Sequence, residues 1–258
     1  MTHPLIDGFR DHIAKFIVHI EATWDESGET KTMHATGFIA APASHESYSE
    51  ELCVVITARH VVADLPTHEV RWKLTRYAEP GQQNATFEFK LPGLMPSFSK
   101  IPGVIRTFKP NYDAAAIVIP LVAGVTPPFL EVEKELFPPV IAPGNAVRSG
   151  TEIAWAGYPF LITQFLKRPQ LCVYRGMVSA AVLDIDPGMY IVDGHAAQGV
   201  SGGPVWHSDD KSHRIIGVVS SYLLHGGEMP GLCHFTPVNQ LTKFLSDGIQ
   251  LDEESEDK

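Results

Sequence analysis

Cysteine is scarce in this sequence. Only Cys53, Cys172 and Cys233 occur among 258 residues, an odd number whose spacing fits no zinc-binding pattern. Cys53 and Cys172 lie in apolar runs, which favours buried thiols. Because β-rich secreted proteins of this size usually carry disulfides, we expect free thiols and a reducing, cytoplasmic compartment.

Long hydrophobic runs and basic runs are missing as well. No stretch approaches the roughly 20 apolar residues of a membrane span, and the start, MTHPLIDGFRDHIAKF, carries charges throughout, unlike a signal peptide. Lys and Arg are scattered in a chain of formal net charge −10, so we expect neither nucleic acid nor a membrane as a partner. No HExxH motif or His/Asp cluster occurs, and no metal or cofactor is expected.

Short alternating runs dominate what is present. Hydrophobic residues make up 44% of the chain, enough for a sizeable core. Alternation predicts six strands in each half of the chain, with a proline-rich stretch at 125–147 between them that cannot form a central strand. The predicted strands cover 16–22, 35–41, 53–58, 69–74, 86–91 and 114–119, and then 151–159, 172–180, 189–194, 203–207, 214–221 and 232–238.

Two sets of six strands indicate an all-β protein with two β-barrels. The only helices expected are short and terminal, one over roughly residues 4–14 and one after Pro237. The expected organisation is an N-terminal segment with the first barrel (1–124), a Pro-rich linker (125–148), the second barrel with the C-terminal helix (149–248), and an acidic tail (249–258) in contact with solvent.

A serine lies in a glycine-rich turn, HAAQGVSGGPVW, at residues 195–206. An unactivated hydroxyl is a poor nucleophile and needs a base and a pair of donors for the oxyanion that forms on attack. Glycine allows a tight turn that brings backbone N–H groups close to a reacting carbonyl. The N–H groups of Gly199 and Ser201 would form that oxyanion hole, although a bare loop without chemistry fits the same pattern.

A base and its orienting carboxylate have candidates in the first half. His60 follows an apolar strand in ITARHVV, and Asp113 directly precedes one in NYDAAAIVIP. Taken singly, His60 could be an ordinary loop residue and Asp113 a turn residue. A carboxylate beside a buried strand needs a partner, which a histidine N–H can supply. Together, His60, Asp113 and Ser201 make a candidate catalytic triad.

These segments resemble the signatures of the trypsin/chymotrypsin-like serine peptidases. TARHVV, DAAAIVI and GVSGGPV occur in the order His, Asp, Ser that this clan uses. ATGFIAAP, GYP, GMVSA and IIGVVSS extend the resemblance over roughly residues 15–245. It is strongest to the disulfide-free bacterial branch with the HtrA/Deg-type peptidases, and we expect no PDZ domain in this chain. The resemblance implies two six-stranded antiparallel barrels of chymotrypsin-like type and a serine endopeptidase that works through an acyl-enzyme.

Val200 departs from the family. Secreted members carry an aspartate directly before the nucleophile, and a freed N-terminus pairs with it on activation. With valine there, the oxyanion hole must be held by packing, or form only when a partner or substrate arrives. Two alternatives therefore stay open beside the active peptidase: a latent effector protease that a protein partner activates in a bacterial stress or defence system, and an inactive peptide-binding pseudo-peptidase.

The resemblance also implies where a peptide substrate binds. In this family the peptide adds as a strand to an edge of the second barrel, which here contains Ser220 and Tyr222. The first specificity pocket would be lined by His195, Ala196 and Tyr222, with no aspartate at its base to favour Lys or Arg. His195 could select an acidic or amide side chain; alternatively, it points into solvent and the pocket takes a small or apolar residue.

Overall fold

The structure of the chain is a computed structural model. The structure describes residues 5, 13–40, 52–66, 68–76, 84–92, 104–107, 112–120, 140–141, 147–182, 188–209, 212–222 and 231–238.

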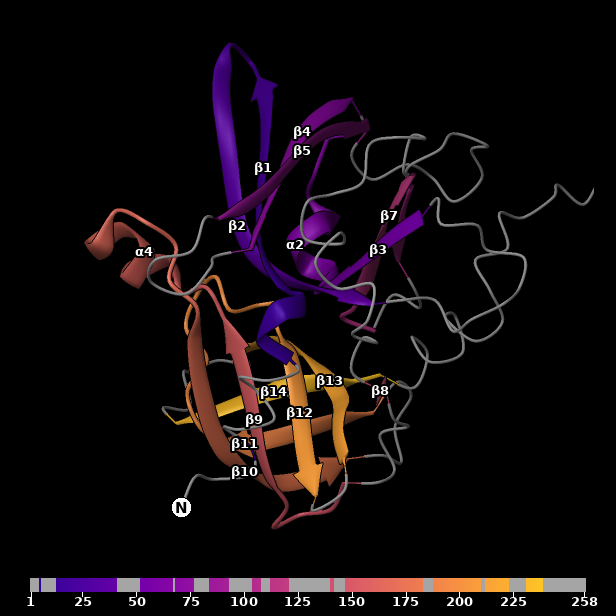
Figure 1. Ribbon diagram of the computed structural model, residues 1–258, viewed down its shortest axis with the longest axis vertical. Helices are drawn as coiled ribbons and strands as arrows, with labels where there is room; N and C mark the ends of the chain where they lie inside the picture. The colour runs from indigo at the N-terminus through magenta and orange to yellow at the C-terminus, as the bar shows by residue number, and fades with distance from the viewer. Residues whose placement is uncertain are drawn as a thin grey trace, which may run out of the picture.

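Seven strands of the first half form one antiparallel sheet. Their order is β5-β4-β1-β2-β3-β7-β6, and no pairing in the described part of the chain joins β5 to β6, so the sheet is a half-barrel (Figure 1). Its strands are β1 (Ile17–Glu26), β2 (Glu29–Ala40), β3 (Leu52–Thr57), β4 (Glu69–Arg76), β5 (Ala85–Pro92), β6 (Val104–Thr107) and β7 (Ala115–Pro120).

The second half forms a closed antiparallel barrel. Its strands run in the order β12-β9-β10-β11-β14-β13, and a pairing between β12 and β13 closes the ring. A two-residue strand, β8 (Val140–Ile141), lies parallel to β13. The barrel strands are β9 (Glu152–Gly157), β10 (Cys172–Val182), β11 (Met189–Asp193), β12 (Pro204–Asp209), β13 (Ser212–Tyr222) and β14 (Leu232–Pro237).

The predicted chymotrypsin-like architecture is confirmed, with additions. Every predicted strand segment overlaps a strand of the expected sheet, while β6 and β8 were not predicted. Two short internal helices were also missed: α2 (Arg59–Ala63) and α4 (Phe160–Leu166). At the N-terminus the structure has a 3-10 helix, η2 (Ala14–Phe16). Most of the predicted N-terminal helix, the C-terminal helix after Pro237 and the acidic tail lie outside the described residues.

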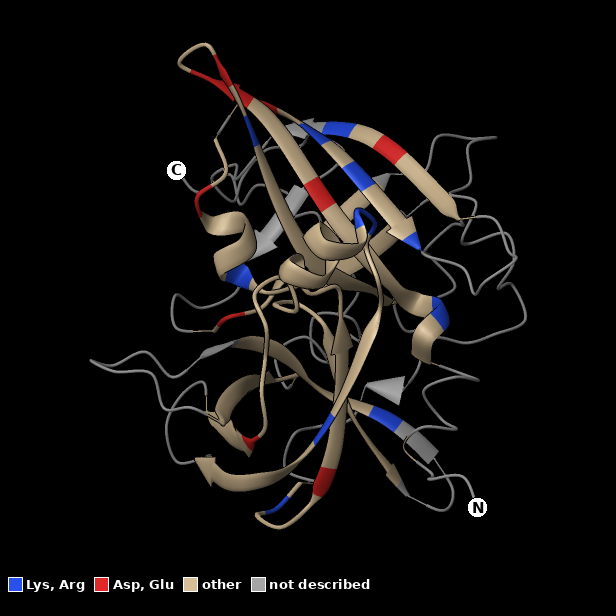
Figure 2. Cartoon of the chain, turned by 90° about the vertical axis from the view of Figure 1, so that its left-hand side faces the viewer, with Lys and Arg blue, Asp and Glu red and all other residues tan. Residues whose placement is uncertain are grey.

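No helix in the described part of the chain is long and apolar enough to cross a membrane. Charged residues of both signs occur along the strands of the first sheet (Figure 2).

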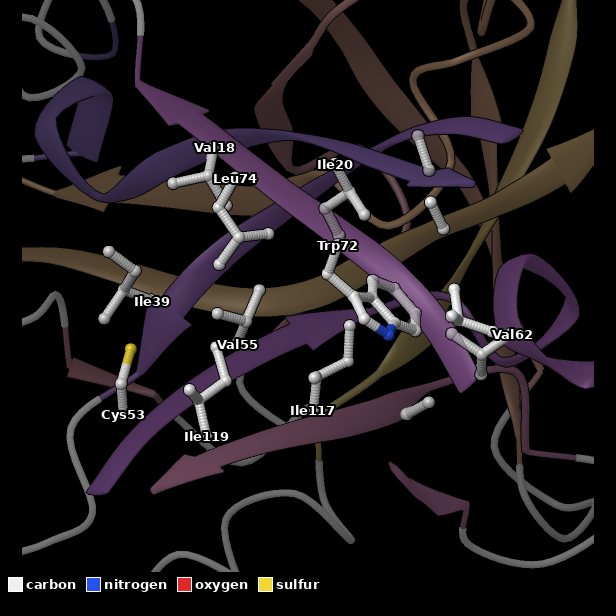
Figure 3. Close-up of a cluster of buried hydrophobic side chains, with 14 of the residues drawn as sticks. Val18, Ile20, Ile39, Cys53, Val55, Val62, Trp72, Leu74, Ile117 and Ile119 are labelled. Atoms are coloured by element: carbon white, nitrogen blue, oxygen red, sulfur yellow. The ribbon is translucent and has the colours of Figure 1, made fainter. Parts of the chain in front are cut away.

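Each of the two sheets packs around an apolar core, and a further apolar cluster lies between the sheets. The core of the first sheet surrounds Trp72, which is almost fully buried among branched side chains such as Val55 and Ile117 (Figure 3). A separate cluster joins Phe38 and Ile56 of the first sheet to Val218 of the second. This shared core fixes the two sheets against each other and positions the loops where they meet.

Candidate active site

His60 lies on a helix of five residues that begins where β3 ends. The preceding Ala58 is extended, and α2 begins at Arg59. Val62 is fully buried and fixes the helix against the first core, which leaves the His60 side chain 46% exposed. The change from strand to helix therefore presents the imidazole at the surface of a rigid sheet.

Asp113 directly precedes β7 and binds His60 twice. Thr57 at the end of β3 pairs with Ala115 at the start of β7, so the two residues lie at the same sheet edge. The Asp113 Oδ1 accepts the backbone N–H of His60 at 2.8 Å, and Oδ2 lies 2.8 Å from His60 Nδ1. With Nδ1 as the donor in this bond, Nε2 is the ring nitrogen that can take up a proton.

The environment of Asp113 favours its charged form. Burial raises the pKa of this carboxyl, but the hydrogen bonds and charge of His60, together with the Ser220 hydroxyl, bring the pKa below its usual value. An ionised Asp113 can hold the imidazole in one orientation and stabilise its protonated form.

Ser201 lies in a turn that requires glycine on both sides. Gly199 and Gly202 have φ values of +93° and +88°. A Cβ on Gly202 would come within 2.1 Å of the Thr36 carbonyl oxygen, so no side chain fits there. The glycine-rich sequence is therefore a structural requirement of the turn against β2.

The Ser201 hydroxyl points to β13. Its Oγ donates to the Ser220 carbonyl oxygen at 3.1 Å, and no hydrogen bond joins it to His60 among the described residues. Ser220 is fully buried, and its own hydroxyl lies 2.5 Å from Thr236 Oγ1. The Ser220 side chain also lowers the pKa of Asp113. Ser220 therefore contacts the candidate nucleophile through its carbonyl and influences the carboxylate through its hydroxyl.

Hydrogen bonds fix the peptide groups on either side of Gly199. The Gln198 carbonyl accepts the N–H of Phe160 at 2.8 Å. The Gly199 carbonyl accepts the Thr36 hydroxyl at 2.7 Å, and Thr36 Oγ1 in turn accepts the Tyr158 N–H at 2.9 Å. Because C=O and N–H point in opposite directions across a trans peptide, the bond to Phe160 directs the Gly199 N–H away from α4.

The two predicted oxyanion donors remain available. In the described part of the structure, the N–H groups of Gly199 and Ser201 take part in no backbone hydrogen bond. Val200 between them is fully buried in the second barrel and donates its N–H to Ala197 at 3.1 Å. From the sequence, this turn would be held by packing around Val200 or would form only with a partner or substrate. The hydrogen bonds of Thr36 and Phe160 add directional constraints that the sequence did not reveal.

The predicted substrate-binding residues lie on both sides of this turn. Ala196 is buried, whereas His195 is exposed. Tyr222 pairs through its backbone with Cys233 at the end of β13; its side chain lies outside the described part. Gly194, beside His195, donates its N–H to the Gly231 carbonyl at 2.7 Å. This hydrogen bond joins the segment that contains His195 and Ala196 to the residue directly before β14.

Three residues of the site were missed in the sequence: Thr36, Phe160 and Thr236. Thr36 and the GYP segment belong to stretches that carry the family resemblance, but their hydrogen-bonding roles depend on contacts between segments more than 120 positions apart. In the described part, no group of three or more His, Cys, Asp or Glu side chains could hold a metal ion.

The three cysteines are free, as predicted. Burial raises the pKa of Cys53 and of Cys233 to about 12, with the nearby Asp193 charge adding to the effect at Cys233. Burial also raises the pKa of Cys172. These thiols are protonated and poorly reactive at neutral pH.

A half-barrel and a closed barrel meet beside a His–Asp pair and a serine in a glycine-rich turn. This arrangement defines the chymotrypsin-like class of proteins. The family model described as "Trypsin-like peptidase domain" matches residues 35–218. The chain therefore belongs to the trypsin-like peptidase family. No curated protein matches the sequence.

Solved structures of HtrA-type proteases share the fold. The HtrA-type protease AlgW with a decapeptide, and an alanine-substituted form of it with a decapeptide, each superpose with a TM-score of 0.55 at 14% sequence identity. Both alignments cover 93% of this chain, but only 66% and 64% of the AlgW chains. This chain thus spans slightly less than two thirds of their length, and the likeness concerns the fold.

Proposed function

We propose that the protein is a serine endopeptidase in which Ser201 is the nucleophile, His60 the general base and Asp113 the residue that orients His60. The observation that carries this proposal is the double hydrogen bond between Asp113 and His60, beside a serine turn shaped by Gly199 and Gly202. An ionised carboxylate on Nδ1 leaves Nε2 as the acceptor that nucleophilic catalysis needs.

In the proposed reaction, the Ser201 hydroxyl turns from the Ser220 carbonyl to His60. Nε2 takes the hydroxyl proton as Oγ attacks the peptide carbonyl, and the N–H groups of Gly199 and Ser201 stabilise the oxyanion. The protonated His60 then gives its proton to the leaving amine, and an acyl-enzyme remains on Ser201. Water repeats the sequence with His60 as base, which releases the acid and restores the hydroxyl.

The substrate is proposed to be a peptide segment of a protein. It would lie along Ser220 and Tyr222 as an added strand, with its specificity side chain near His195 and Ala196. The AlgW structures with a decapeptide support peptide binding on this fold. Two forms of the pocket remain candidates: one in which the exposed His195 selects an acidic or amide side chain, and one that takes a small or apolar side chain.

The proposed organisation and location follow the sequence. Residues 1–124 would carry His60 and Asp113, residues 149–248 would carry Ser201, and 125–148 would connect them ahead of an acidic tail at 249–258. A cytoplasmic location is supported by the three free cysteines, since β-rich secreted proteins usually form disulfides.

A latent, partner-activated peptidase is the second candidate. It is favoured by the hydrogen bond from Ser201 Oγ to the Ser220 carbonyl, which holds the hydroxyl away from His60 in this structure. Free enzymes often show looser catalytic hydrogen bonds than substrate complexes, so the rate of the isolated protein distinguishes the two candidates.

Proteolysis of an unfolded protein substrate tests the proposal. The purified wild-type protein is expected to cleave it, while Ser201→Ala and His60→Ala should lose nearly all activity, because triad residues act as a unit. Both variants should keep the wild-type melting temperature within a few degrees. Equal cleavage by wild type and Ser201→Ala would refute the assignment. Cleavage that appears only after a protein partner is added would favour the latent form.

A further inference from the structure

Large apolar side chains that remain exposed in the described part of the chain all lie in one segment, residues 160–177. We name five of these side chains the α4 patch: Leu161, Ile162, Phe165 and Leu166 on α4, and Val173 at the start of β10. Met177 lies further along β10, where it pairs with Glu152. Leu161 is 70% and Phe165 86% exposed. Gly157 pairs with Cys172, so the two strand ends that flank α4 are neighbours and the patch is local. Single exposed apolar residues are common, but a group of them indicates a binding surface.

The segment that carries the patch differs in charge from the whole chain. Residues 160–182 contain no Asp or Glu but include Lys167, Arg168 and Arg175, in a chain of net charge −10. Arg175 pairs with Glu152 at 3.3 Å. Lys167 and Arg168 are exposed directly after α4, which is wholly uncharged and projects towards the viewer in Figure 2. The patch thus suits a ligand with apolar and acidic side chains.

The helix that carries the patch starts next to the candidate active site. The first residue of α4, Phe160, donates its N–H to Gln198, next to the proposed oxyanion donor Gly199. Its ring also lies against His34 of β2, with ring centroids 5.8 Å apart. Ser201 and Gly202 contact β13 on the other flank of the same turn, through Ser220 and Val219. The part of a peptide before the cleaved bond would pair with β13 on one side of the turn. The part after the cleaved bond would then leave the turn on the other side, towards α4.

We propose that the α4 patch is an exosite for the part of a protein substrate that follows the cleaved bond, and that it selects segments with apolar and acidic residues. This inference rests on the proposed peptidase function. It adds a second element of specificity, separate from the pocket beside His195. A membrane surface fits less well, because two basic residues on a chain of net charge −10 give little attraction to anionic lipids.

Paired peptides test the exosite. Two quenched-fluorescent peptides share the residues before the cleaved bond; after it, one carries apolar and acidic residues and the other only Gly and Ser. The wild type is expected to prefer the first in kcat/KM by about tenfold or more, mainly through KM, as burial of one or two apolar side chains predicts. The double variant Leu161→Gln/Phe165→Gln should lose this preference, and Lys167→Glu/Arg168→Glu should reduce it. Gln164→Ala, on the same helix, should leave it unchanged.

Labelling with a small fluorophosphonate separates the exosite from a defect at the catalytic centre. The probe does not reach α4, so the double variant should label at the wild-type rate. An unchanged preference in the double variant would overturn the proposal. So would an equal loss of labelling and cleavage, because α4 would then only support the oxyanion turn. Binding of the wild type to anionic phosphatidylserine vesicles that the double variant loses would assign the patch to a membrane instead.

Failure of the peptidase proposal would be recognised separately. If the wild type neither labels nor cleaves, the same peptides are measured by fluorescence anisotropy on Ser201→Ala protein with and without the α4 changes. Tighter binding of the apolar, acidic peptide that depends on Leu161 and Phe165 would support the exosite in a peptide-binding protein. Equal binding of both peptides would overturn it.

Discussion

Asp113 is the residue on which the state of His60 depends. Replacement by asparagine keeps the size of the side chain but removes the charge, and an amide can direct its N–H to Nδ1, which favours the wrong tautomer. We expect Asp113→Asn to lower kcat by about 10⁴-fold, as the loss of the equivalent carboxylate does in enzymes of this mechanism. KM should change little. The measurement is steady-state cleavage of a fluorogenic peptide.

The same substitution has a pH signature in stability. Because the folded-state pKa of Asp113 is lowered, its carboxylate stabilises the fold at pH values above the unfolded pKa, about 3.9. This contribution is lost as pH falls through the lower, folded pKa. The difference in melting temperature between wild type and Asp113→Asn should therefore shrink on acidification below about pH 4. A constant difference down to pH 2 would show that the carboxylate is not held as its charged form.

At the scale of elements, Thr36 of β2 connects the two sheets at the serine turn. Its buried hydroxyl bonds the Gly199 carbonyl and the Tyr158 N–H, which belong to the second half of the chain. Thr36→Val keeps the shape but leaves both groups without this partner, at a cost of about 1–3 kcal/mol in unfolding free energy. We also expect kcat to fall by about 10²-fold, with KM nearly unchanged, because the oxyanion peptide is less well fixed.

Thr36→Ser is the matched variant, since it restores the hydroxyl and should recover most of the activity. Chemical denaturation and peptide kinetics measure the two effects. Wild-type kcat in Thr36→Val would contradict a role of this hydroxyl in positioning the turn.

Strands were predictable where side chains alternate or form a short apolar run, and the shortest elements were not. The run 53–58 predicts β3 because it is a short, mostly apolar run that contains three apolar β-branched residues in a row. The helix α2 that follows at Arg59 has only five residues, too few to give a periodic signal. α4 was missed because its exposed apolar residues show no buried stripe. β8 contains two residues within a proline-rich stretch, and its pairing with Arg214 and Ile215 is a tertiary contact.

Part of the candidate site was predictable from the sequence for the same reason. The identity and order of His60, Asp113 and Ser201 are local patterns, whereas the direction of the Ser201 hydroxyl and the bonds of Thr36 and Phe160 depend on how the two sheets meet. No local propensity encodes those contacts.

For the whole molecule, the thiols test the proposed compartment. All three cysteines are free, and Cys53 and Cys233 are buried. A reductant should leave the melting temperature unchanged, and thiol titration should count three thiols in denatured protein. Titration of the native protein should be slow, because burial keeps these thiols protonated. Fewer than three thiols after non-reducing denaturation would indicate a disulfide and contradict the reducing compartment.

The central claim is that Ser201 is a nucleophile activated by His60, and covalent labelling tests it most directly. Wild-type protein is treated with a fluorophosphonate, its intact mass is measured, and the modified residue is located by peptide mapping. We predict one adduct per chain, on Ser201, none in Ser201→Ala, and a large drop in labelling rate in His60→Ala. An adduct on another residue, or equal labelling of wild type and Ser201→Ala, would contradict the account.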